Sequence, residues 1–157
     1  MFKNVRFYRL TSSWPDSEEE LTEALSTAGF RPCGPLTEKI SGWEPPSADP
    51  AGPLGRRLDG ADLLQLRTQS RLLPAAAVNE ALEERIEEFR DRMGQEPGRR
   101  EKRRLKEQTR DNLLPYTLLR SERTKGLLFL SEKIFAIDAS TPAKAEQFLG
   151  YLRAPLG

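Results

Sequence analysis

The sequence predicts an α+β fold: a mostly antiparallel sheet with packed helices, from which a charged two-helix arm projects. Residues Phe2–Leu10 alternate in polarity and are rich in aromatic and β-branched side chains, as in a strand. Two apolar runs, Leu127–Leu130 and Ile134–Ile137, flank residues 131–133 as the strands of a hairpin do. Between the first strand and this hairpin, Pro74–Pro115 shows helical spacing interrupted by a Gly/Pro turn.

The composition indicates a soluble globular protein of one domain, or of one domain with an arm. The chain has 157 residues, of which 37% are hydrophobic and 31% charged, and its net charge is +1. No apolar run is long enough to cross a bilayer, and Met1–Leu10 alternates instead of forming a leader peptide. The single cysteine, Cys33, excludes an internal disulfide and fits a reducing compartment. The sequence therefore predicts a cytoplasmic protein without a membrane partner.

The first helix is predicted to start at Ser17, which forms a capping box with Glu20. Its apolar stripe lies within Leu21–Ala28, and Gly29 is predicted to end it in the left-handed conformation. Residues 30–60 are rich in proline and glycine and are predicted to form a loop. A strand is then predicted over Leu63–Leu73, paired with residues near Ile40.

Two helices of opposite charge follow. The acidic helix has Pro74 in its first turn and an apolar stripe within Val78–Met93. The basic helix follows the turn at 94–98 and has few apolar residues, mainly Leu105, Leu113 and Leu114. From position 94 to position 110, seven basic residues stand against three acidic ones, a local net charge of +4.

The last third of the chain is predicted to return to the sheet. Leu118–Lys125 is predicted to link the basic helix to the hairpin, whose apolar strands belong in the centre of the sheet. The final helix is predicted to be capped by Ser140 or Thr141, with Pro142 in its first turn. The predicted domains are an α+β core at 1–73 and 120–157 and a helical arm at 74–119.

The basic helix is the strongest candidate for a binding site. Arg99, Arg103, Lys106 and Arg110 share one face of it, so they could follow a row of phosphates. The alternative is a solvated face that pairs with the acidic helix, and the residues alone slightly favour this alternative. Arg120, Arg123 and Lys125 could extend a basic groove, although ordinary loop charge explains them better. Several other residues have open alternatives. The basic residues of the first strand either protect a sheet edge or bind phosphates; they are Lys3, Arg6 and Arg9. The aromatic residues of the loops either anchor those loops on the core or stack on bases; they are Trp14, Phe30, Trp43 and Tyr116. Cys33 is either a buried small residue or a reactive thiol.

Residues suited to catalysis are scarce. The chain has no histidine, no cysteine pair for zinc and no phosphate-binding glycine loop. Asp138 is the one carboxylate at a strand end that could hold a catalytic metal, and a role in the following turn explains it better. The sequence predicts a protein that is not an enzyme and has no cofactor and no metal.

An ordered set of segments resembles the family of recombination-associated proteins called RdgC. The resemblance lies in FKNVRFYRL, FRPCG, GWEPP, LLPAAAVNEALEERI, LKEQTRDNLLPYTLLRS and FAIDASTPAKAEQFLGYLR, in that order over nearly the whole chain. Family members continue for about another domain, so the chain resembles their N-terminal half.

The resemblance implies a nucleoid-associated protein that binds DNA with little sequence preference. It also implies a homodimer that closes a ring around duplex DNA and opposes RecA filaments through the DNA. One of the ring's two contacts would lie near the arm and the other in the part that this chain lacks.

Together, residues and resemblance predict binding to double-stranded DNA, with single strands as an open alternative. The predicted DNA-binding residues are Arg99, Arg100, Arg103, Arg104, Lys106, Arg110, Arg120 and Arg123. The predicted dimer interface consists of Leu113, Leu114, Phe89 and Ile86. The alternative is an interaction or dimerisation module that does not bind DNA, in which the acidic and basic helices pair between subunits.

Overall fold

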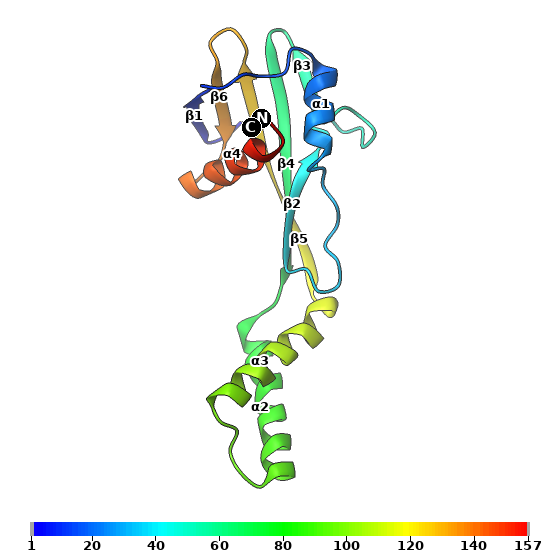
Figure 1. Cartoon of the computed structure of the whole chain (residues 1–157), viewed down its shortest axis with the longest axis vertical. Coiled ribbons are helices and arrows are strands. Elements are labelled where there is room, and N and C mark those ends of the chain that lie inside the picture. The colour runs from blue at the N-terminus through cyan, green and yellow to red at the C-terminus, as the bar shows by residue number, and fades with distance from the viewer. Residues whose placement is uncertain (1, 157) are drawn as a thin grey trace. The chain divides into compact units, whose positions relative to one another are not determined.

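The computed structural model describes residues 2–156 and confirms the α+β class (Figure 1). In chain order its elements are β1 (Val5–Arg9), α1 (Glu18–Ser26), β2 (Lys39–Glu44), β3 (Gly55–Leu58), β4 (Ala61–Leu72), α2 (Ala75–Met93), α3 (Arg99–Leu113), the 3-10 turn η1 (Leu114–Tyr116), β5 (Leu118–Phe129), β6 (Ile134–Asp138) and α4 (Pro142–Leu156). Within the described residues, no helix is long and apolar enough to span a lipid bilayer.

The strands form one sheet in the order β1-β6-β5-β4-β2, and β3 pairs with β4. The pairs β1–β6, β5–β6 and β3–β4 are antiparallel. The apolar strands β5 and β6 lie inside the sheet, as their sequences predict, and β1 forms an edge. The predicted pairing of the long strand with residues near Ile40 is also confirmed, because β2 neighbours β4.

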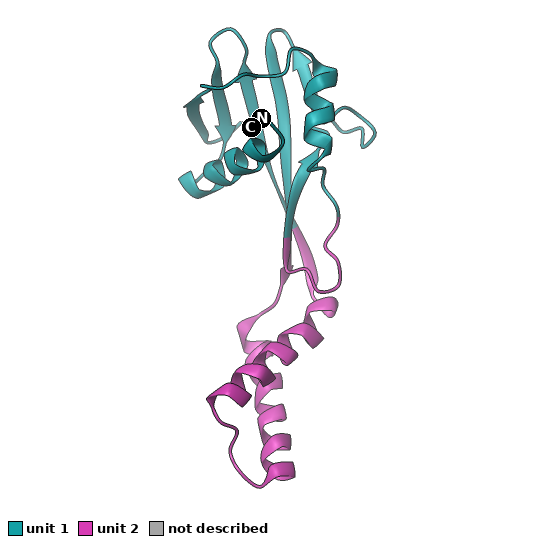
Figure 2. Ribbon diagram, in the orientation of Figure 1, with its two compact units in different colours: residues 1–31, 40–68, 121–157 teal, residues 32–39, 69–120 magenta. Residues whose placement is uncertain are grey.

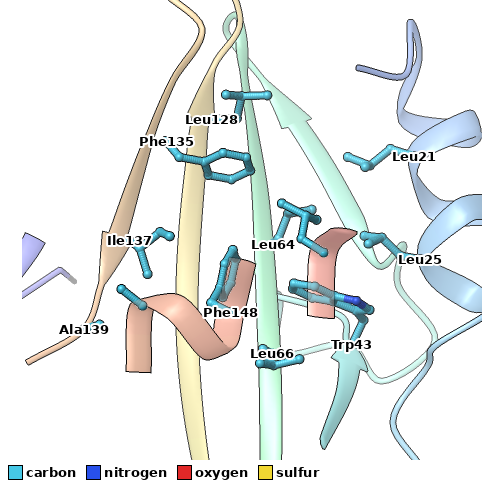
Figure 3. Close-up of a cluster of buried hydrophobic side chains, with 12 residues drawn as sticks. Leu21, Leu25, Trp43, Leu64, Leu66, Leu128, Phe135, Ile137, Ala139 and Phe148 are labelled. Atoms are coloured by element: carbon cyan, nitrogen blue, oxygen red, sulfur yellow. The ribbon is translucent and has the colours of Figure 1, made fainter. Parts of the chain in front are cut away.

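The core lies between one face of the sheet and the helices α1 and α4. Figure 3 shows Trp43 of β2, Phe148 of α4 and Leu64 of β4 pointing toward one another. The rings of Trp43 and Phe148 meet edge to face with centroids 5.0 Å apart. Gly126 of β5 allows this packing, since a Cβ there would lie 2.4 Å from Cζ of Phe148. Close approach of α4 to the sheet therefore depends on a residue without a side chain.

Contacts divide the chain into two compact units, coloured separately in Figure 2. Unit 1 contains residues 1–31, 40–68 and 121–157, and unit 2 contains residues 32–39 and 69–120. Unit 1 holds the core just described. Unit 2 holds α2, α3 and η1, together with the ends of β4 and β5.

The start of α1 is as predicted, but its end is not. Ser17 caps the helix by accepting a hydrogen bond on Oγ from the N–H of Glu20, at 3.1 Å. The helix ends at Ser26, and Gly29 is not in the left-handed conformation, so its predicted role was wrong. Gly29 instead forms a parallel bridge with Trp43, because the chain after α1 runs directly along β2.

Two predicted loops are strands. Residues 30–60 contain β2 and β3, and Leu118–Lys125 forms the first part of β5 rather than a linker. β3 is joined to β4 by the two-residue turn Asp59-Gly60, in which both residues have a positive φ, and an Asp-Gly pair is a local hairpin signal. β2 and the first part of β5 have little apolar periodicity, so pairing with β4 decides their conformation. The N-cap of α4 was predicted correctly, since Thr141 Oγ1 accepts a hydrogen bond from the N–H of Lys144 at 3.3 Å.

Candidate nucleic-acid interface

The turn between α2 and α3 is built as the sequence predicts. Gly94 ends α2 in the left-handed conformation, with φ of 73°, and its N–H bonds the carbonyl of Arg90 at 2.8 Å. The Arg90 side chain forms an ion pair of 2.5 Å with Glu96 in the turn. This hydrogen bond lowers the pKa of the Glu96 carboxyl and raises that of Arg90. Pro74 is the N-cap of α2 rather than part of its first turn.

The basic helix α3 buries a narrow edge. Leu105 is 8% exposed and Thr109 is 1% exposed, and the Thr109 hydroxyl donates to the carbonyl of Leu105 at 2.6 Å. These two residues are one turn apart and therefore fix which side of the helix faces inward. Most of the remaining surface of α3 is exposed.

The predicted basic row comprises Arg99, Arg103, Lys106 and Arg110. The first three are exposed, and among the described residues none of them forms an ion pair. Arg110 is half-buried and pairs with Glu38 at 2.9 Å. Three of the four cations are thus available to an anionic ligand. Arg110 could bind such a ligand only if its ion pair with Glu38 breaks.

The other predicted DNA-binding residues have different surroundings. Arg100 is exposed, and Arg104 pairs with Glu101 on the same helix at 2.5 Å. Arg120 is exposed on β5 in unit 2. Arg123 lies on β5 in unit 1, where it pairs with Glu44 at 2.6 Å. Arg123 is thereby committed to the sheet rather than to the basic helix.

Within the chain, the acidic helix does not neutralise the basic one. Among residues 2–156, no ion pair joins a carboxylate of α2 to a basic residue of α3. The two helices do pack together, and Phe89 and Leu105 line a shallow groove between them. The pairing within one subunit that the residues alone slightly favoured is therefore absent from the described part of the chain, and the basic row keeps its charge.

Arg71 positions α3, and no pattern in the sequence pointed to it. Its guanidinium donates from Nη2 to Gly34 O at 2.9 Å, from Nε to Thr37 O at 3.2 Å and from Nη1 to Leu114 O at 3.3 Å. The Leu114 carbonyl lies at the C-terminal end of α3 and also accepts hydrogen bonds from the N–H and the hydroxyl of Thr117, at 3.2 and 2.6 Å. A single arginine therefore joins residues 34–37 to the end of the basic helix.

The apolar residues of unit 2 are partly buried within the unit itself. Of the four predicted interface residues, Leu114 is only 5% exposed, and Leu113, Phe89 and Ile86 are half-buried. Larger exposed fractions occur at two residues that were not assigned to the interface, with Tyr116 at 88% and Leu118 at 76%. The sequence places Tyr116 directly after the basic helix and Leu118 at the start of a predicted linker, and neither position indicates how exposed the side chain is.

Several other candidates have structural roles. Asp138 Oδ1 accepts hydrogen bonds from the N–H groups of Lys3 and Asn4, at 3.1 and 3.0 Å, and so holds the chain before β1. Cys33 is half-buried and its thiol donates to Gln69 O. The described residues contain no group of three or more potential metal ligands.

Among the aromatic candidates, some anchor the fold and one is exposed. Trp43 is a core residue, and Trp14 packs edge to face on Phe135, so both anchor the fold as expected. Phe30 lies under the guanidinium of Arg67 at 4.3 Å. Tyr116 does not anchor a loop on the core, since it is almost fully exposed.

Comparison with known proteins relates the whole chain to one family. The model of the RdgC family, described as "Putative exonuclease, RdgC", matches residues 1–157. The recombination-associated protein RdgC of Pseudoalteromonas atlantica is 31% identical over 156 residues, which cover 99% of this chain and 52% of that protein. The proteins of the same name from Bordetella pertussis and Cupriavidus pinatubonensis are 32% and 34% identical, over 96% of this chain and 50% of each relative. The chain thus spans about half the length of these curated relatives, and it belongs to the RdgC family.

Proposed function

We propose that the chain binds DNA through α3 without reading its sequence, in a process associated with recombination. The observation that carries this proposal is the row of exposed cations on α3 that the chain's own acidic residues leave unpaired. Arginine and lysine side chains at such spacing neutralise phosphates, which carry no base identity. The names of the relatives, all recombination-associated proteins, support the process.

The mechanism is electrostatic and involves no chemistry on the nucleic acid. Each phosphate that Arg99, Arg103 or Lys106 neutralises releases a condensed counterion. Arg110 can add a fourth contact by exchanging Glu38 for a phosphate. Protein bound in this way along DNA occupies the backbone that a recombinase filament needs, and so opposes RecA indirectly.

The dependence of affinity on salt tests this mechanism. For duplex DNA the slope of log affinity against log salt is about −0.9 per phosphate, so three contacts give about −2.7 and four give about −3.6. In the variant Arg103→Ala with Lys106→Ala, the slope should become shallower by about 1.8, equally for unrelated DNA sequences.

A matched control removes two exposed basic residues from unit 1, Arg56→Ala with Lys144→Ala. It lowers the net charge by the same amount and should leave the slope unchanged. If the slope of log affinity against log salt becomes shallower by the same amount in both double variants, binding depends on the net charge of the chain and α3 is not the site.

The alternative function, an interaction or dimerisation module, is favoured by a different observation. Tyr116 and Leu118 are both strongly exposed, and Leu72 and Leu119 of the same unit are exposed as well. The surfaces of monomeric proteins rarely expose large contiguous groups of apolar residues. If this alternative is correct, Leu118→Gln dissociates a homodimer in sedimentation experiments, and the Arg103/Lys106 double variant binds DNA with an unchanged slope.

A further inference from the structure

We propose that a pocket of unit 1 binds the carboxyl-terminal residue of another protein, where that residue has a large apolar side chain. The pocket is bounded by the end of β1, by residues 11–14 that follow it and by the second half of α4, and its volume is about 210 Å³. We call it the β1–α4 pocket. Every residue that lines it belongs to unit 1, so the proposal does not involve α3 and is independent of the proposed DNA binding.

Much of the wall of the β1–α4 pocket is apolar. Trp14 and Phe135 line it, with their rings edge to face and their centroids 5.4 Å apart. Leu149, Leu152 and Leu156 also line it, and their spacing of three and four places them on one face of α4. A cavity of about 150 Å³ lined by side chains of this kind binds benzene, so this pocket has room for one aromatic ring.

The charged residues that line the pocket are both basic. Arg9 belongs to the edge strand β1 and Arg153 to the last turn of α4, and both are exposed. Among the described residues, neither guanidinium forms an ion pair or a side-chain hydrogen bond. The carboxylate behind Trp14, that of Asp62, is already paired with Arg57 at 2.8 Å. An apolar wall and positive charge without an internal partner fit a ligand that is both apolar and anionic.

The charges next to the pocket do not cancel those that line it. Asp16 lies two residues after Trp14, and the hairpin turn beside Leu10 carries Glu132 and Lys133. These three neighbours contribute one positive and two negative charges. With the two arginines of the lining, the surroundings of the pocket keep a net positive charge.

The segment that borders the pocket has free hydrogen-bonding groups. Thr11, Ser12 and Ser13 line the pocket, are exposed and belong to no helix or strand. Within residues 2–156, their backbone N–H groups and their hydroxyls have no hydrogen-bond partner. Three successive residues of this kind can pair with the backbone of an extended peptide. A small apolar acid would leave these groups unused, so the segment favours a polypeptide as the ligand.

The last residue of a polypeptide combines the features that the pocket requires. Its side chain and its carboxylate are attached to the same Cα, so the side chain can enter the apolar part while the carboxylate meets a guanidinium. Arginine binds a carboxylate through two parallel N–H donors. The preceding residues of the ligand then extend along residues 11–13. An internal segment of a protein lacks the carboxylate, and a DNA backbone lacks an apolar group beside its charge.

The first experiment measures peptide binding to the full chain by fluorescence anisotropy. The probe is fluorescein-Gly-Ser-Gly-Ser-Phe with a free carboxylate, compared with its carboxyl-terminal amide and with the same peptide ending in Ala. We expect the probe to bind with a dissociation constant below about 1 mM, and the other two to bind at least about tenfold more weakly. The amide loses the charge-assisted hydrogen bonds, and the Ala peptide loses the buried ring. Equal binding of the three peptides, or no binding of the probe at about 1 mM, would overturn the proposal.

Two protein variants test the contact with the carboxylate. Arg153→Gln removes a guanidinium of the pocket, and Lys144→Gln removes one positive charge from an exposed residue of α4 that does not line it. We expect Arg153→Gln to weaken the free-carboxylate probe about tenfold and to leave the amide unchanged, while Lys144→Gln changes neither. If both variants weaken the probe equally, the net charge of the chain explains the binding. If Arg153→Gln weakens the probe and the amide equally, Arg153 does not bind the carboxylate. Either result would overturn the proposal.

A final measurement tests where the probe binds. The chain has two tryptophans, and only Trp14 lines the β1–α4 pocket, whereas Trp43 is in the core. Their indole N–H signals in a nitrogen–proton correlation spectrum are assigned with Trp14→Phe. We expect unlabelled probe peptide to shift the Trp14 signal and to leave the Trp43 signal in place. A shift of Trp43 alone, or of neither signal at saturating peptide, would place the peptide elsewhere and overturn the proposal. No readout involves DNA, so a failure here is distinguishable from a failure of the proposed DNA binding.

Discussion

Asp62 is a fully buried carboxylate, and its partners explain how it is tolerated. It accepts hydrogen bonds from Trp14 Nε1 at 2.7 Å and from Arg57 Nε and Nη2 at 2.8 and 2.9 Å. The hydrogen bond to Asp62 raises the pKa of the Arg57 guanidinium. Arg57 also donates to the carbonyls of Pro15 and Asp16. The segment before α1 is therefore attached to the sheet through one ion pair.

Replacing Asp62 by alanine should lower the free energy of unfolding by about 3 kcal/mol, because Trp14 loses its acceptor and the Arg57 guanidinium loses its carboxylate partner. Glu23→Ala removes an exposed acidic residue and should change it by no more than about 0.5 kcal/mol. Urea unfolding followed by tryptophan fluorescence measures both. Equal midpoints for the two variants would contradict the role assigned to this ion pair.

Two glycines of unit 1 should respond in opposite ways to alanine. Gly126→Ala places a Cβ against Phe148 and should destabilise the fold by about 1–3 kcal/mol. Gly150 lies in α4, where an added Cβ would meet nothing within 4 Å, so Gly150→Ala should stabilise by about 0.4–1 kcal/mol. Thermal unfolding of the two variants gives the signs, and a stabilised Gly126→Ala would show that α4 does not approach the sheet this closely.

At the scale of elements, Arg71 should stabilise the last turn of α3 against local unfolding. In Arg71→Met, the carbonyls of Gly34, Thr37 and Leu114 lose the hydrogen bonds from the guanidinium, while the aliphatic part of the side chain is kept. Amide hydrogen exchange in the last turn of α3 should become faster. The control Arg56→Met, an exposed residue of β3, should leave that exchange unchanged. Unchanged exchange in both variants would mean that packing alone holds the end of the helix.

Elements with strong local signals were the ones that the sequence predicted well. The alternating β1, the capped α1 and α4 and the Gly94 turn all carry their information within a few residues. The strand β3 was missed although the Asp59-Gly60 turn that joins it to β4 is a local signal. The first part of β5 was missed because its partner, β4, is distant in sequence. The same reason hid Arg71, whose hydrogen bonds reach residues 37 and 43 positions away along the chain.

The candidate site was predicted to a similar extent. Helical spacing alone placed Arg99, Arg103 and Lys106 on one face, and they are exposed. Spacing could not show that Glu38 holds Arg110 or that Glu44 holds Arg123, because both carboxylates come from segments that were predicted as loop. Whether a cation is available to a ligand depends on such distant partners.

At the scale of the whole molecule, α2 and α3 are inserted between two strands that are neighbours in the sheet. A variant in which an Asn-Gly turn replaces residues 74–117 should therefore keep the unit 1 fold, since such a turn can join neighbouring strands when they are antiparallel. It should unfold cooperatively and bind DNA with almost no salt dependence. Loss of folding in circular dichroism would show that unit 1 depends on unit 2, and retention of the full slope would place the DNA site in unit 1.

The same insertion affects the order in which the chain folds. Pairing β4 with β5 requires the 45 residues between Leu72 and Leu118 to close a loop. Closing a disordered loop of that length costs about 2 kcal/mol more than closing one of about five residues, since each doubling adds about 0.6 kcal/mol. Helices that turn back on each other at Gly94 need only local contacts and form on a faster timescale than a non-local sheet. If α2 and α3 form first, they shorten the effective loop and bring β4 and β5 together. The two helices would then also increase the rate at which the sheet forms.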